Sequence, residues 1–79
     1  MTTTIAPDID VDARGLSCPL PLLRAKRALN DMRSGQRLRV LATDPGSADD
    51  FRVFAERTGH ALLELTERNG EYCILLQKA

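Results

Sequence analysis

The spacing of hydrophobic and polar positions changes several times along the chain. Residues 9–13 alternate apolar and acidic side chains, and residues 36–42 alternate polar or basic side chains with apolar ones. A period of two residues is typical of a strand that buries one face. Both segments are therefore predicted to be strands, the second with Leu38, Val40 and Ala42 pointing inward.

A helical period follows the first predicted strand. From Pro19 to about residue 33, apolar residues recur at intervals of three and four. Leu23 lies off this apolar face and should be partly exposed. Gly35 is expected to end the helix in a left-handed conformation. The predicted buried face consists of Leu22, Ala25, Ala28, Leu29 and Met32.

A second helix is predicted after the turn sequence Asp44-Pro45-Gly46. Ser47 and Asp50 have the spacing of a capping box, in which each side chain accepts a hydrogen bond from the backbone N–H of the other residue. Gly59 should end this helix. Its predicted buried face consists of Ala48, Phe51, Phe54, Ala55 and Thr58.

The last third of the chain is expected to form a hairpin. Residues 61–67 and 71–78 alternate in the manner of strands, and Asn69-Gly70 between them is the strongest short-range hairpin signal. A two-residue loop places Arg68 opposite Glu71. The remaining predicted pairs are Leu65 with Ile74 and Leu63 with Leu76 on the core face, and Thr66 with Cys73 and Glu64 with Leu75 on the other face.

The order strand, helix, strand, helix, strand, strand (β-α-β-α-β-β) predicts an α/β (α+β) two-layer sandwich. Two helices would cover one face of a four-stranded mixed sheet. With 79 residues the chain should form one domain, residues 1–79, in which residues 1–7 are expected to be disordered. Its 43% hydrophobic and 28% charged residues match a soluble globular protein. Without an apolar run of roughly 18–20 residues or a secretory signal, we expect a cytoplasmic monomer.

Charge is unevenly distributed although the chain has no net charge. Residues 24–39 contain six basic residues and one acidic residue, a net charge of +5. Arg24, Arg27 and Arg33, with the exposed Leu23, are therefore candidates for docking protein partners. The alternative is a solvated helix face whose late bases merely complement the helix dipole.

Cys18 lies where the first strand passes into the first helix, in the sequence Cys-Pro-Leu-Pro. Proline is tolerated in the first turn of a helix, so Pro19 should be the first helical residue, Pro21 the third and Cys18 the N-cap. Cysteine is a poor N-cap, and a broken local rule often marks a functional site. The alternative is a small buried hydrophobic residue.

A thiol at a helix N-terminus should have a lowered pKa, and the thiolate is the nucleophilic form. Because Pro19 and Pro21 lack amide hydrogens, chiefly the Leu20 N–H should point at the sulfur, and we expect a modest lowering. Cys73 lies in a strand and is expected to be structural, and His60 should have a capping or surface role. Two cysteines and one histidine are too few for a structural zinc site, so we expect no metal and no cofactor.

Residues 12–21, Asp-Ala-Arg-Gly-Leu-Ser-Cys-Pro-Leu-Pro, resemble the Cys-Pro-x-Pro signature of the TusA (SirA-like) family of sulfur-carrier proteins. The Asp44-Pro45 turn is also similar, and the likeness runs from about residue 9 to residue 78. The resemblance implies a sulfurtransferase in which Cys18 carries sulfane sulfur as a persulfide, with Gly15, Pro19 and Pro21 positioning it. A cysteine desulfurase or a rhodanese-type enzyme would be the donor, and a second protein the acceptor.

The resemblance leaves the destination of the sulfur open among transfer-RNA thiolation, molybdenum-cofactor synthesis and sulfur metabolism. Leu20 stands where the transfer-RNA branch usually has glutamate. The competing interpretation is a small RNA-binding or protein-interaction module that uses the basic first helix. Neutral overall charge, few aromatic residues and the lack of a Gly-x-x-Gly or RNP-like motif argue against direct RNA binding. A thiol-redox role would require Cys18 and Cys73 to lie within disulfide reach.

Overall fold

The structure, a computed structural model, describes residues 7–79. Its elements follow the predicted order of strands and helices. They are β1 (Ile9–Ala13), α1 (Leu20–Asn30), β2 (Arg37–Ala42), α2 (Ser47–Thr58), β3 (Ala61–Arg68) and β4 (Glu71–Gln77).

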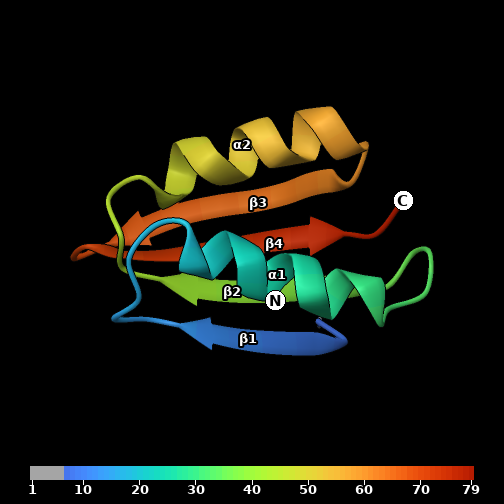
Figure 1. The fold of residues 1–79 in the computed structure, drawn as a ribbon, viewed down its shortest axis with the longest axis horizontal. Helices are drawn as coiled ribbons and strands as arrows, with labels where there is room; N and C mark the ends of the chain where they lie inside the picture. Colours follow the sequence, from blue (N-terminus) through green and yellow to red (C-terminus); the bar gives the residue numbers. More distant parts are fainter. Residues whose placement is uncertain (1–6) are drawn as a thin grey trace, which may run out of the picture.

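The four strands form one sheet in the order β1-β2-β4-β3. β1 runs parallel to β2, whereas β4 is antiparallel to both β2 and β3. Both helices cover the same face of this mixed sheet (Figure 1). The predicted two-layer sandwich is confirmed, and β1 and β3 are its two edges.

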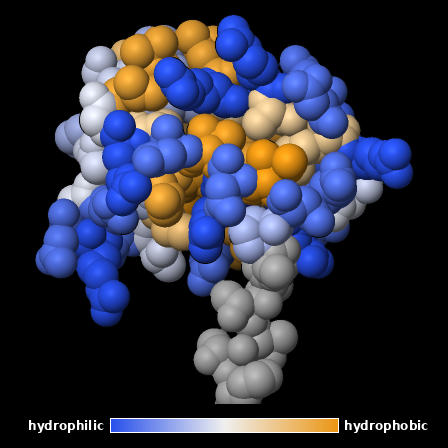
Figure 2. All heavy atoms as spheres, turned by 90° about the horizontal axis from the view of Figure 1, so that it is seen from below, coloured by the Kyte–Doolittle hydropathy of each residue, from blue (hydrophilic) through white to orange (hydrophobic). Residues whose placement is uncertain are grey.

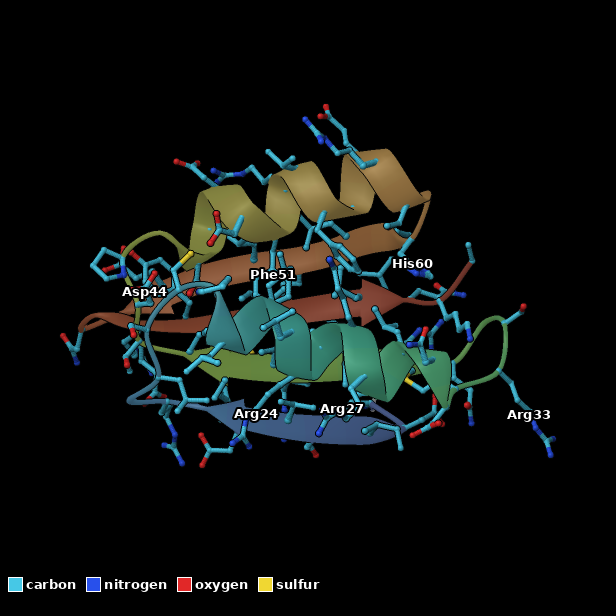
Figure 3. All side chains as sticks on the ribbon, viewed as in Figure 1. Arg24, Arg27, Arg33, Asp44, Phe51 and His60 are labelled. Atoms are coloured by element: carbon cyan, nitrogen blue, oxygen red, sulfur yellow. The ribbon has the colours of Figure 1, made fainter. Side chains whose placement is uncertain are left out.

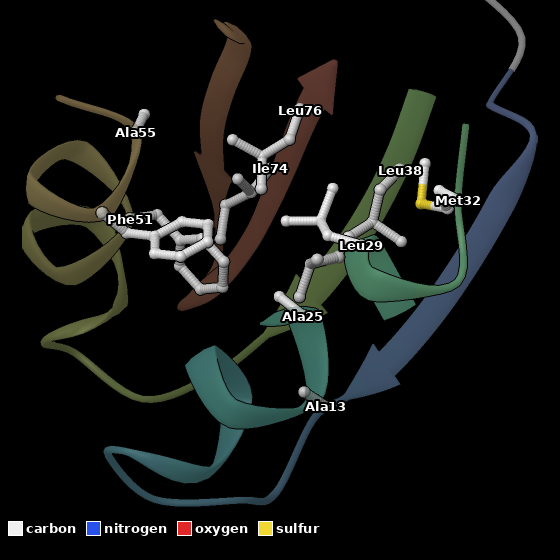
Figure 4. Packing of buried hydrophobic residues seen from close by; sticks show 11 residues of the cluster. Ala13, Ala25, Leu29, Met32, Leu38, Phe51, Ala55, Ile74 and Leu76 are labelled. Atoms are coloured by element: carbon white, nitrogen blue, oxygen red, sulfur yellow. The ribbon is translucent and has the colours of Figure 1, made fainter. Parts of the chain in front are cut away.

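The core lies between the sheet and the helices (Figure 4). Leu38, Val40 and Ala42 of β2 are fully buried, as their alternation predicts. From α1, Leu22 and Ala28 are only partly buried, and Pro21 is buried although it was not predicted to be. The other main contributions come from Ala25, Leu29, Met32, Phe51, Phe54, Ile74 and Leu76.

The first helix is shorter than its apolar pattern predicts. It ends at Asn30, and Asp31 occupies the C-cap. Gly35 does have a left-handed backbone, with φ of 88°, but it belongs to the turn before β2. There its N–H donates to the carbonyl of Lys78 at 2.8 Å. The prediction that Gly35 caps the helix was therefore wrong.

The predicted capping box of the second helix is also absent. Gly46 is the N-cap, and no side chain caps the helix start. Ser47 is instead the first helical residue and is buried. The Asp50 side chain accepts a hydrogen bond from the thiol of Cys18, which lies in the loop before α1. The predicted end at Gly59 is confirmed. Phe51, Phe54 and Ala55 are buried as expected, but Ala48 is only partly buried and Thr58 is exposed.

The hairpin at Asn69-Gly70 is confirmed, and both residues have the positive φ that this tight turn requires (52° and 79°). Four of the predicted cross-strand pairs are present. The pairing of Leu63 with Leu76 was wrong, because an irregularity between Leu62 and Glu64 inserts an extra residue into β3. Leu62 lies opposite Leu76 instead, and Leu63 is 38% exposed.

The expected disorder of residues 1–7 concerns mainly residues 1–6, which lie outside the described part of the chain. Neither described helix is long and apolar enough to cross a membrane.

Candidate functional site

Cys18 is exposed in the loop between β1 and α1. It lies two residues before the helix, because Pro19 occupies the N-cap position and α1 begins at Leu20. The prediction that Cys18 caps the helix was therefore wrong. The Cys18–Pro19 peptide bond is cis, and the Leu20 N–H donates to the Ser17 carbonyl at 2.9 Å. That amide was expected to point at the sulfur.

The group that does contact the sulfur is a carboxylate on the other helix. The Cys18 thiol donates a hydrogen bond to Oδ2 of Asp50 in α2, with 2.9 Å between sulfur and oxygen. A second carboxylate, that of Asp44 in the loop after β2, is also close. One side-chain sulfur or oxygen from each of these three residues lies within 4.8 Å of the other two. We call Cys18, Asp44 and Asp50 the thiol–carboxylate cluster.

Two contacts of the surrounding loops hold the cluster together. The Asp44 carboxylate accepts a hydrogen bond from the Gly46 N–H at 3.0 Å. The N–H of Gly15 donates to Oγ1 of Thr43 at 2.9 Å, which fastens the loop that carries Cys18 to the end of β2. Gly15 has φ of +82°, a conformation that side chains disfavour. The positioning role expected of Gly15 stays a prediction.

The electrostatics of Cys18 are the reverse of the sequence-based expectation. The hydrogen bond to Asp50 is the main cause that raises the pKa of the Cys18 thiol above its ordinary value of 9.0. The negative charges of Asp50 and Asp44 add to the effect. A thiolate facing two carboxylates is repelled, whereas a thiol can donate to one of them. This environment favours the protonated thiol, whose proton must leave before or during nucleophilic attack.

The thiol–carboxylate cluster is also the place where a metal ion would find ligands, since it offers one sulfur and two carboxylate oxygens. Structural zinc sites usually take four ligands, mostly cysteine and histidine. Cys18 and Asp50 instead satisfy each other through the thiol hydrogen bond, and Asp44 accepts from the Gly46 N–H. The arrangement is suited to controlling the protonation of a reactive sulfur.

The structure brings together three of the four predicted docking residues. Leu23, Arg24 and Arg27 lie on the exposed side of α1 and line one groove beside β1. Arg33 follows the end of α1 and lies at the opposite end of the molecule from Asp44 (Figure 3). Arg33 is therefore separate from the site around Cys18.

Cys73 has the structural environment that was expected of it. It lies in β4 opposite Leu41 and Thr66, on the sheet face turned away from the helices. Burial raises the pKa of its thiol. Cys18 bonds to a helix on the other face, and both cysteines are free. The sheet thus separates the two thiols, which opposes the redox alternative.

His60 likewise makes structural contacts. Its ring packs against Phe54 with 5.7 Å between ring centroids, and its Nδ1 accepts a hydrogen bond from the Ala79 N–H at 3.0 Å. No thiol or carboxylate faces it in these contacts. His60 therefore stays outside the site.

Asp44 and Asp50 are the residues that the sequence reasoning missed. Asp50 was assigned to a capping box and Asp44 to a turn. A signal for both was present, since β1 and β2 were predicted as consecutive strands joined by a helix. The carboxyl ends of two parallel strands meet at one edge, so the loops after residues 13 and 42 were bound to be neighbours.

Comparison with known proteins gives consistent matches over nearly the whole chain. Residues 9–78 match the family model described as sulfurtransferase TusA. The sulfur carrier protein TusA of Allochromatium vinosum is 54% identical over 91% of this chain and 95% of its own length. A putative sulfur carrier protein of Neisseria meningitidis is 49% identical over 85% and 90% of the two chains. The crystal structure of a SirA-like protein from Desulfitobacterium hafniense superposes with a TM-score of 0.78 at 32% identity, covering 87% of this chain and 95% of that one.

Proposed function

The chain belongs to the TusA family of sulfur carriers, and from this membership we propose that Cys18 accepts sulfane sulfur as a persulfide and passes it to an acceptor protein. The observation that carries the proposal is the exposed sulfur of Cys18 in the Cys-Pro-Leu-Pro segment, where the thiol is held by the hydrogen bond that it donates to Asp50 of α2. An exposed sulfur is within reach of a second macromolecule. The protein acts as a sulfurtransferase that is more a carrier than a complete catalyst.

In the loading step, the Cys18 sulfur attacks the terminal sulfur of a persulfide on the donor protein. A new S–S bond forms at Cys18, and the S–S bond of the donor breaks, its electron pair passing to the donor's cysteine sulfur. That sulfur takes up the proton that Cys18 releases. A thiol and a persulfide exchange places, so no external oxidant or reductant is required. Delivery to the acceptor is the same exchange in the opposite sense.

The two carboxylates of the thiol–carboxylate cluster suit both halves of this cycle. In the empty carrier, Asp50 holds the Cys18 sulfur in place and keeps it protonated. A persulfide is a stronger acid than a thiol, so the loaded sulfur is more readily anionic. An anion beside Asp44 and Asp50 is repelled, which favours delivery of the sulfur. Asp50 is a positioning residue in this scheme, acting through Cys18.

The donor in this proposal is a cysteine desulfurase or a rhodanese-type enzyme. The sulfur leaves for transfer-RNA thiolation, molybdenum-cofactor synthesis or sulfur metabolism. Leu20, which replaces the glutamate usual in the transfer-RNA branch, is 45% exposed and lies two residues from the sulfur. It presents an apolar surface to whichever partner approaches Cys18.

Mass spectrometry tests the carrier role. After incubation with a cysteine desulfurase and cysteine, the protein should gain about 32 Da, the mass of one sulfur atom. The adduct should be absent from Cys18→Ser and retained in Cys73→Ser, the matched control on the other face of the sheet. An equal adduct on the Cys18→Ser variant would overturn the proposal.

A further inference from the structure

An open groove of about 700 Å³ runs between α1 and the outer edge of β1. Seen from the β1 side, the surface shows apolar side chains gathered between charged ones (Figure 2). The groove is lined by Asp10, Val11, Asp12, Leu20, Leu23, Arg24, Arg27, Ala28 and Asp31. The sulfur exchange at Cys18 does not itself use this surface.

The apolar part of the groove comes from both elements. Val11 of β1 and Ala28 of α1 are partly buried in it, whereas Leu20 and Leu23 are 45% and 50% exposed. Two large exposed apolar side chains three residues apart lie on one side of a helix. A partner that covered them would remove apolar surface from water at the centre of the groove.

The floor of the groove is an edge strand. β1 pairs only with β2 among the described strands, so its outer side offers backbone N–H and C=O groups to another chain. An edge strand with a helix alongside is the arrangement in which extended peptides bind by adding a strand. A helix packed into this groove would leave those backbone groups unpaired.

The charged residues of the groove favour a partner with acidic side chains. Asp10 is paired with Arg39 at 2.6 Å and Asp12 with Arg14 at 2.9 Å, so both acids already have cationic partners. Arg24 and Arg27 make no ion pair with any residue from 7 to 79 and point from α1 to the side where β1 lies (Figure 3). Asp31, at the end of α1 farther along the chain from Cys18, is the remaining acid. The two guanidiniums favour carboxylates.

We propose that an extended segment of a partner protein binds in this groove as an additional strand beside β1, with apolar and acidic side chains on the side that faces α1. The inference rests on the carrier function, since it names how the partner docks. Leu20 lies at the end of the groove nearest Cys18 in the chain, so a segment held there brings the rest of the partner to the sulfur. Arg33 has no part in this contact.

The experiment uses a cysteine desulfurase as the probe and measures the rate at which its persulfide passes to Cys18. Leu23→Glu and the double variant Arg24→Glu/Arg27→Glu should each slow transfer about tenfold or more, as losses at the centre of an interface do. Val53→Glu and Arg57→Glu are the matched controls. Both side chains are exposed on α2, and Val53 is 45% exposed. Transfer that is unchanged in the groove variants, or slowed equally in the controls, would overturn the proposal.

Hydrogen exchange distinguishes a partner bound as an added strand from other ways of occupying the groove. Backbone amides of residues 9–13 should exchange more slowly when the desulfurase is bound. Protection confined to α1 would contradict strand addition. Protection of β1 that grows with the concentration of this protein alone would indicate a second copy as the occupant, and would equally contradict the proposal.

A small-molecule sulfur donor tests the loading of Cys18 independently of protein docking. Inorganic polysulfide needs no protein contact, so the groove variants and the native protein should acquire the sulfur on Cys18 to the same extent. If the native protein fails to load from polysulfide and from the desulfurase alike, the carrier function itself is refuted. If the native protein loads from polysulfide and the groove variants also load from the desulfurase at the native rate, the docking proposal alone fails.

Discussion

At the scale of the residue, the chemistry of Cys18 depends on a contact with a distant part of the chain. A free thiol exposed to solvent is open to oxidation in proportion to its thiolate fraction. Asp50 lowers that fraction by accepting the thiol hydrogen bond at 2.9 Å. In the proposed cycle, the empty carrier is thus held in a less reactive form until a donor disturbs the hydrogen bond or supplies another destination for the proton.

Asp50→Asn should lower the pKa of Cys18 towards its ordinary value of 9.0, because the substitution removes the nearest negative charge. The pH profile of iodoacetamide alkylation should shift to lower pH, and alkylation at pH 7 should become several-fold faster. Asp49→Asn is the control, since the Asp49 side chain is 88% exposed and pairs with Arg52. An unshifted profile in Asp50→Asn would contradict the role assigned to this carboxylate.

The hydrogen bond between Cys18 and Asp50 also makes the free energy of unfolding depend on pH. The folded state raises the pKa of Cys18, so it favours the protonated thiol more than the unfolded chain does. The stabilisation is fully present below the pKa of the unfolded thiol and is lost as pH rises through the higher folded value. Any difference in unfolding free energy between the native protein and Asp50→Asn that comes from this titration should therefore shrink at alkaline pH.

At the scale of the element, the irregularity in β3 decides which leucine enters the core. Strict alternation from Leu65 places Leu63 inward, but the extra residue turns Leu63 outward and brings Leu62 opposite Leu76. Leu62 packs partly buried against the core, whereas Leu63 is 38% exposed. The inserted residue lets β3 keep Leu65 and Leu62 on one face although they are three residues apart.

Two single substitutions check this register. Leu62→Ala should reduce the free energy of unfolding by roughly 1–3 kcal/mol, because it removes a side chain packed against the core. Leu63→Ala should cost no more than about 0.5 kcal/mol, in line with surface positions. Urea denaturation of both variants measures the difference. The reverse order of stability would mean that β3 pairs without the inserted residue.

At the scale of the whole molecule, a chain of 79 residues depends on a few large buried side chains. Phe51 is fully buried and contacts Phe54 edge-on, with 6.4 Å between ring centroids. It joins α2 to the sheet, and α2 also carries Asp50. The packing of the core and the position of the carboxylate at Cys18 are therefore linked through one helix.

Phe51→Ala should destabilise the protein by about 3–5 kcal/mol, a large part of the roughly 5–15 kcal/mol expected for a whole domain. Thermal unfolding followed by circular dichroism would show the loss. Val53→Ala, on the exposed side of the same helix, should leave the transition nearly unchanged. A small effect of Phe51→Ala would contradict the central place of this side chain in the core.

The sequence by itself determined the order of the elements, the fold class and the Asn69-Gly70 hairpin, and it singled out Cys18 as the predicted site. Each of these depends on residues close together in the chain. Alternation shows which face of a strand is buried, an Asn-Gly pair accepts positive φ, and two prolines mark a helix start. These predictions therefore rest on interactions between residues close together in the chain, and on the family resemblance of the Cys-Pro-Leu-Pro segment.

Only the tertiary structure decided the hydrogen-bond partner of Cys18, the register at Leu63 and the shape of the groove between α1 and β1. Asp50 reaches the sulfur across 32 positions of sequence, and the groove joins β1 to α1 at the open edge of the sheet. A local argument assigned a lowered pKa to Cys18 because it considered the helix start alone. The opposing carboxylate comes from α2, and its distance of 2.9 Å from the sulfur exists only once the parallel strands have brought the Cys18 loop beside the start of α2.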